Sequence, residues 1–175
     1  MSTLSDRMPA STPSASSSRT PDVSARAPRT GATSGPELAR LALDAALSKK
    51  GLDVTVMDLR GISGEVDYFV IATGESDLQI RAIVDAVVEQ LRTEAGERPL
   101  HREGQPGTSR WIVLDYFDLV VHVFDPELRA HYDLERLWGD APTETVTDER
   151  PEASILSADA PAASDDVSDD APPAS

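Results

Sequence analysis

The residues of this chain that could do chemistry are its histidines and a scattered set of aspartates. Asp115 and Asp118 precede His122, whereas Asp77 and Asp85 lie earlier, in a segment with helical periodicity. A two-metal site needs carboxylates that converge on the ions. Carboxylates spread over a helix and a turn do not converge. We therefore expect no metal site and no catalytic residue among these acids.

The histidines do not indicate catalysis either. No carboxylate stands at metal-ligand spacing from His101 or His122, and a histidine on a strand is more often a hydrogen-bonded structural residue. The chain has no cysteine, no Gly-x-Ser-x-Gly and no His-Glu-x-x-His, which excludes several hydrolase classes. We expect a protein that is not an enzyme and needs no cofactor, and we assign His122 to packing or to an interface.

Hydrophobic periodicity predicts the elements that carry these residues. Apolar positions recur at the helical period after Pro36 and again between a Ser76-x-x-Gln79 capping box and Gly96. A third helix begins at Asp125-Pro126. Alternating or continuous apolar runs predict strands at 53–59, 68–73, 100–102, 111–115 and 119–124. The order α-β-β-α-β-β-β-α predicts an α/β (α+β) fold, a mixed sheet flanked by helices.

Composition predicts one domain between two tails. Residues 1–35 are rich in Ser, Pro and Arg, and residues 141–175 are rich in Ala, Pro and Asp, with Ile155 and Leu156 as their only adjacent large aliphatics. Such segments bury too little apolar surface to offset the entropy of ordering them. We expect both tails to be disordered and dispensable, and residues 36–140 to form the domain.

The charge of the chain constrains its partners. It has 31 acidic and 16 basic residues, which makes it a poor direct binder of nucleic acid and suits it to a basic protein. No apolar run reaches the roughly 20 residues of a membrane span, and the N-terminus lacks the apolar core of a secretory signal. We expect a bacterial cytoplasmic protein, with an organellar transit peptide as the alternative reading of the Ser- and Arg-rich leader.

Two blocks of sequence carry a resemblance to a known family. The first is Asp-Tyr-Phe-Val-Ile-Ala-Thr-Gly-Glu-Ser at 67–76, and the second extends from Trp111 to Trp138. Together they resemble the ribosomal silencing factor family, also called Iojap-like. The resemblance implies a sheet related to that of nucleotidyltransferases. It also implies a homodimer when free, docking on the large ribosomal subunit through ribosomal protein fourteen, and a steric block of subunit joining. Phe117 departs from the family, in which many members have a small turn residue.

The resemblance and the density of aromatic and acidic residues near the end of the domain together indicate a partner-binding surface. Aromatics at these spacings are often core residues, yet Tyr and Trp flanked by charge are typical of interaction hot spots. Aromatic side chains would supply contact area, and acids would meet Lys or Arg of the partner. The predicted partner-binding residues are Trp111, Asp115, Asp118, His122, Tyr132, Glu135 and Trp138.

Two other functions remain open. A degenerate nucleotidyltransferase would still bind nucleotide, but Gly74-Glu75-Ser76 interrupts the Gly-Ser pair of those enzymes and no Asp-x-Asp follows on a strand. We interpret Ser76 as an ordinary helix cap. A general acidic adaptor in ribosome assembly would show no preference for the large subunit.

Overall fold

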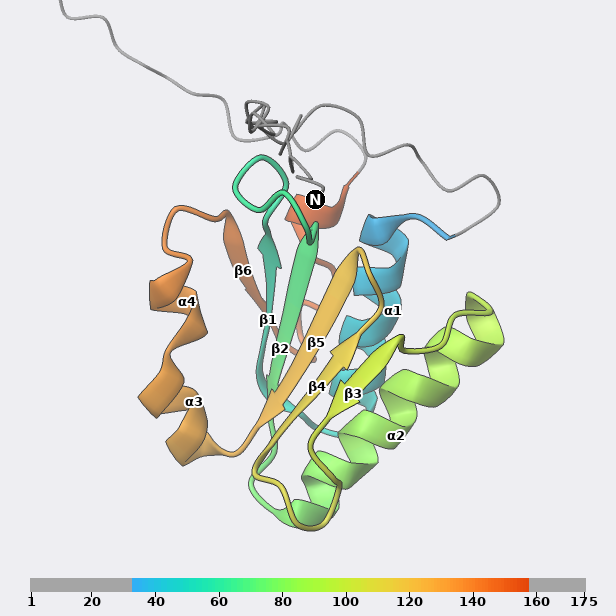
Figure 1. Ribbon diagram of the computed structural model, residues 1–175, viewed down its shortest axis with the longest axis vertical. Helices are drawn as coiled ribbons and strands as arrows, with labels where there is room; N and C mark the ends of the chain where they lie inside the picture. Colours follow the sequence, from blue (N-terminus) through green and yellow to red (C-terminus); the bar gives the residue numbers. More distant parts are fainter. Residues whose placement is uncertain (1–32, 158–175) are drawn as a thin grey trace, which may run out of the picture.

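The computed structural model describes residues 33–157, which form a six-stranded sheet with helices on both faces (Figure 1). The strands in chain order are β1 (Leu52–Asp58), β2 (Tyr68–Thr73), β3 (His101–Glu103), β4 (Trp111–Asp115), β5 (Leu119–Phe124) and β6 (Thr143–Val146). Across the sheet their order is β3-β4-β5-β2-β1-β6. The pair β2 and β5 is parallel and the other neighbouring pairs of these strands are antiparallel, so the sheet is mixed, as predicted.

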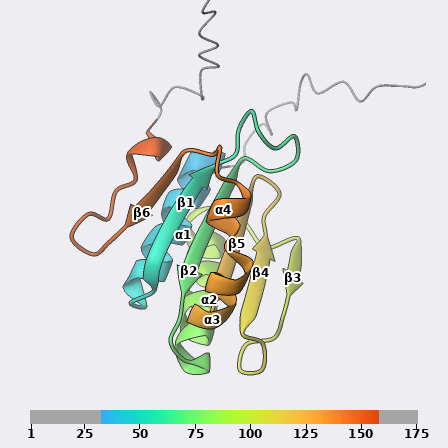
Figure 2. The same cartoon turned by 90° about the vertical axis from the view of Figure 1, so that its left-hand side faces the viewer.

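The helices lie in two layers. On one face lie α1 (Gly35–Ser48) and α2 (Asp77–Glu94), and on the other lie α3 (Pro126–Tyr132) and α4 (Leu134–Leu137). Figure 2 shows α3 and α4 in front of β2 and β5, with β4 and β3 to one side of them. The second helical layer therefore leaves part of its face of the sheet open.

The start of α2 follows the predicted capping chemistry. The Ser76 hydroxyl accepts a hydrogen bond from the Gln79 amide at 3.2 Å, as a helix N-cap does. The Gln79 side chain also donates to the Lys50 carbonyl at 2.7 Å, which links the end of α1 to the start of α2. Gly74 allows this turn to close, because a Cβ there would lie 2.8 Å from the Ile80 side chain.

Strands β1, β2, β4 and β5 place alternate residues in two separate cores. Residues such as Val70, Val121 and Ile112 pack under α1 and α2 in the larger core. Residues of the opposite parity, among them Ile71 and Phe124, form a smaller core under α3 and α4. A strand buried on both faces should read as a continuous apolar run, and β2, which contributes to both cores, was predicted on that basis.

The predicted domain boundary at residue 140 is wrong. Residues 143–146 form β6, which pairs antiparallel with β1 at one edge of the sheet. The chain then returns through a 3-10 turn, η1 (Ser154–Leu156), and buries Val146, Ala153 and Leu156 in the larger core. The apolar content of this segment is low, but its few large side chains are all placed inward. The predicted disorder of 1–32 and 158–175 concerns residues outside those described.

The predicted order of elements is confirmed through β5. After β5 the single predicted helix is two short helices, because Asp133 adopts a left-handed conformation (φ 42°) that ends α3 and begins α4. The sheet order alone does not test the relation to nucleotidyltransferases, which stays a prediction.

Candidate protein-interaction surface

The sheet face under α3 and α4 carries a cluster of aromatic rings. Trp111 of β4 stacks on Phe124 of β5, with ring centroids 4.7 Å apart, and the Tyr132 ring at the end of α3 lies 4.7 Å from Trp111. Trp138, just after α4, meets the Phe69 ring edge-on at 5.8 Å. Residues from three strands and two helical ends thus form one aromatic cluster, which includes Trp111, Tyr132 and Trp138 from the predicted set.

His122 lies in the middle of this cluster. The Trp111 indole Nε1 donates to its Nδ1 at 3.3 Å. Because an indole nitrogen can only donate, Nδ1 is the acceptor and the neutral imidazole carries its proton on Nε2. Nε2 is buried and finds no hydrogen-bond partner among the described residues, while the Phe69 ring stands edge-on to the imidazole at 4.8 Å. Burial lowers the pKa of His122 to about 4, so the ring is neutral at physiological pH.

The two predicted aspartates of the hairpin stand at its turn. The Asp115 carboxylate accepts from the Phe117 amide at 2.8 Å. The Asp118 carbonyl accepts from the amides of Asp67 and Tyr68, which fixes the turn to the start of β2. Phe117 between them has φ 78° and is 43% exposed. A bulky residue in the left-handed region is strained, which is a physical reason to expect a small residue here, as the resemblance implied.

Glu135, which was predicted to meet a basic partner, is paired with Arg129 within the protein. Its carboxylate accepts from Arg129 Nε at 3.1 Å and also pairs with Arg129 Nη2, and both side chains are mostly buried. This internal pair reduces the charge that Glu135 offers to a basic partner, and its partner-binding role stays a prediction. The sequence did not reveal this pair because the two residues lie on different helices, six positions apart, outside the usual i, i+3 and i, i+4 spacings.

The outer side of the cluster is formed by α3 and α4. Tyr132 is 47% exposed and Leu137 is 72% exposed, and neither helix has a fully buried residue. Trp111 and Trp138 are half-buried at its border. The predicted set of partner-binding residues did not include Leu137, Phe69 or Arg129. The sequence could have predicted that Leu137 is exposed, since it is a leucine among charged residues in a short helix. The roles of Phe69 and Arg129 depend on tertiary contacts that the sequence does not show.

The structure assembles no metal site among the residues it describes. No group of three or more His, Asp or Glu side chains in 33–157 is arranged to hold a metal ion. Ser76 caps α2, and Asp85 lies on the opposite side of the sheet from Asp115. Within the same residues, no helix is long and apolar enough to cross a membrane.

A mixed sheet whose second face exposes aromatic and aliphatic side chains beside acids has the composition of a protein-interaction surface. Residues 32–171 match the family model described as "Ribosomal silencing factor during starvation". The chain belongs to the ribosomal silencing factor family, and the names of its relatives denote regulation of translation at the ribosome.

Individual relatives agree with this assignment. A ribosomal silencing factor of Halalkalibacterium halodurans is 41% identical over 110 residues, which are 63% of this chain and 92% of the relative. One from Bacillus subtilis is 38% identical over 105 residues, 59% of this chain and 86% of the relative. A crystal structure from Chromobacterium violaceum superposes with a TM-score of 0.58 at 34% identity, covering 61% of this chain and 88% of that one.

Proposed function

We propose that this protein represses translation by binding the large ribosomal subunit through ribosomal protein fourteen, where it blocks joining of the small subunit. Family membership supports action at the ribosome. The observation that supports docking through α3 and α4 is that Tyr132 and Leu137 are exposed on helices without any fully buried residue. Leu128 and Leu134 pack against the smaller core, which leaves the exposed Tyr132 and Leu137 to pack against a partner.

The chemistry of the surface suits a basic protein. Trp111, Tyr132 and Trp138 provide aromatic area in and around the cluster, and Leu137 extends it outward. Asp115 and Asp118 add negative charge at the hairpin turn. Apolar burial would supply most of the affinity, while opposite charges would speed association with a basic ribosomal protein. His122 acts from beneath, holding Trp111 in place through the Nδ1 hydrogen bond.

A matched pair of leucines tests this docking face. Leu137 on α4 is 72% exposed, and Leu78 at the start of α2, on the opposite side of the sheet, is 78% exposed. Changing either to Lys should leave the fold intact because both side chains are in water. We expect Leu137→Lys to abolish the block of subunit joining in a sucrose gradient, and Leu78→Lys to block joining as the wild type does.

The result would contradict the proposed docking face if Leu137→Lys still kept subunits apart at wild-type concentrations. Binding of the wild type to isolated ribosomal protein fourteen, measured by calorimetry, tests the partner itself. Equal binding to both ribosomal subunits would instead favour a general acidic adaptor. Nucleotide binding would favour the degenerate nucleotidyltransferase.

We also propose a homodimer of the free protein and a location in the bacterial cytoplasm. Exposed Tyr132 and Leu137 would be covered in such a dimer, so self-association and ribosome docking would compete. Analytical ultracentrifugation of the wild type and of Leu137→Lys checks this, because the variant should shift toward monomer.

A further inference from the structure

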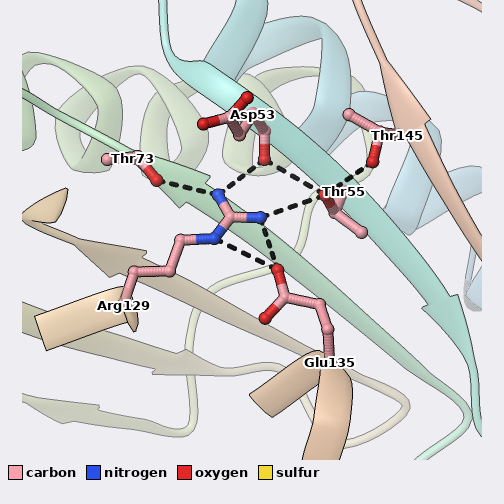
Figure 3. A network of polar contacts seen from close by, with 6 residues as sticks. All are labelled: Asp53, Thr55, Thr73, Arg129, Glu135 and Thr145. Carbon is pink, nitrogen blue, oxygen red and sulfur yellow. Dashed lines mark hydrogen bonds and ion pairs between the residues drawn. The ribbon is translucent and has the colours of Figure 1, made fainter. Parts of the chain in front are cut away.

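Arg129 of α3 is the most fully bonded charged residue at this surface. Its side chain is 14% exposed. A guanidinium has five N–H groups, and the structure gives Arg129 five hydrogen bonds. Figure 3 shows its guanidinium pointing from the helix into the ends of β1 and β2. The acceptors are the Asp53 carbonyl at 2.6 Å, the Thr73 hydroxyl at 2.8 Å, the Thr55 hydroxyl at 3.1 Å and the Glu135 carboxylate.

The sheet is shaped to receive this side chain. The pairing of β1 with β2 is irregular between Leu52 and Thr55, and Asp53 adopts φ 45° within that irregularity. A bulge leaves ladder groups unpaired and re-aims them, and here the Asp53 carbonyl accepts from Arg129. The Thr55 hydroxyl donates its single proton to the same Asp53 carbonyl. In the 3.2 Å contact between the Thr55 and Thr145 hydroxyls, Thr145 of β6 is therefore the donor.

The helices that Arg129 holds are otherwise anchored by Leu128 and Leu134, which pack against the smaller core, and by the Arg110–Glu127 ion pair at the start of α3. Helix α3 has seven residues and α4 has four, and neither has a fully buried side chain. Helices this short are unstable in water without tertiary contacts. Arg129 lies on one side of the bend at Asp133, and Glu135 lies on the other. Their pairing therefore fixes the bend, while the bonds to Asp53, Thr55 and Thr73 fix both helices to the sheet.

We propose that Arg129 is a positioning residue for the docking surface: it clamps α3 and α4 to the ends of β1 and β2 and so sets the placement of Tyr132, Leu137 and Trp138. This inference rests on the proposed function of that surface. Without the clamp the sheet and α1–α2 layer remain folded, because the larger core does not involve Arg129. The helices then sample other placements, and only a fraction of molecules presents a surface that can dock.

Three variants separate the clamp from general stability. Arg129→Met keeps the length of the side chain and removes its donors. Thr73→Val removes one acceptor from the sheet side without changing either helix, and it keeps a branched side chain suited to a strand. Arg136→Met is the matched control, since Arg136 lies on α4, is 87% exposed and pairs only with Asp133 in the described structure, at 3.2 Å.

Hydrogen exchange read by segment gives the first measurement, and binding to isolated large subunits gives the second. Each hydrogen bond to a charged group is worth roughly tenfold or more in an equilibrium constant. We expect Arg129→Met to accelerate exchange in 126–138 by at least about tenfold, with β2 and β5 unchanged, and to weaken docking by a similar factor. Thr73→Val should give a smaller effect of the same kind that does not add to that of Arg129→Met. Arg136→Met should behave as wild type.

Unchanged exchange in 126–138 would overturn the clamp. Faster exchange with unchanged docking would overturn its positioning role, and loss of protection throughout the sheet would make Arg129 a general stability residue. If wild-type protein itself failed to bind large subunits, the proposed function would fall, but the exchange measurement would still decide whether the clamp exists.

Discussion

The C-terminal segment that packs on β1 provides the most decisive test of the fold. A protein that ends after residue 140 lacks β6 and η1, whereas one that ends after residue 157 keeps them. The shorter protein loses Val146 and Leu156, which are 2% and 3% exposed in the larger core. It also loses the cross-strand bonds of β6 to β1 and the Thr145 contact with Thr55.

The magnitude follows from the buried side chains. Fully burying a Val or Leu side chain contributes about 1.5–3 kcal/mol, so the two together contribute about 3–6 kcal/mol. A domain of this size has a total stability of about 5–15 kcal/mol. With each kcal/mol worth roughly 4 °C in melting temperature, we expect the protein ending at 140 to melt about 12–24 °C below the protein ending at 157.

Thermal unfolding followed by circular dichroism measures this difference, with the full-length chain as reference. Val146→Ala in the full-length chain is a milder variant, expected to lower the melting temperature by a few degrees because it leaves a small cavity. Thr147→Ala is its control, since Thr147 is exposed and follows β6. If the proteins ending at 140 and 157 melted within about 2 °C of each other, β6 would contribute nothing and the domain would end where composition alone predicts.

Three further predictions concern the site. Because burial lowers the pKa of His122 to about 4 from an unfolded value of 6.5, the unfolded state binds the proton first. The contribution of His122 to the free energy of unfolding is therefore full above pH 6.5 and falls by about 3 kcal/mol between pH 6.5 and pH 4. Denaturant titrations should show that the free energy of unfolding depends less steeply on pH in His122→Gln than in the wild type. An equal pH dependence in the two proteins would contradict this. Calorimetry with ATP or GTP and magnesium should show no heat beyond dilution, since 33–157 assembles no metal site, and micromolar binding that depends on Asp115 would refute that expectation. Phe117→Gly relieves a left-handed conformation that costs about 1 kcal/mol, so the melting temperature should stay or rise, and a fall of more than about 5 °C would show that the Phe117 ring packs more firmly than its exposure indicates.

The sequence by itself determined the local elements and most of their order. Apolar periodicity located α2, β2 and the hairpin of β4 and β5. In each of these elements the buried apolar residues recur at a regular interval within one continuous segment of sequence. The Ser76 cap was equally local, since donor and acceptor stand three residues apart. The two signature blocks were sufficient to indicate the family, which the match over residues 32–171 confirms.

Tertiary structure alone decided which residues act together. β6 was missed because its four residues read as a polar tail, and only the unpaired edge of β1 makes them a strand. Glu135 looked like a surface acid until Arg129 was found to bind it together with the Asp53 carbonyl and two threonines of the sheet. Those partners are 56 to 76 positions from Arg129 along the chain. Apolar periodicity predicts which face of an element is buried, but it does not indicate which distant groups complete a hydrogen-bond network. The pairing of Arg129 with its distant acceptors holds the surface of α3 and α4 in place.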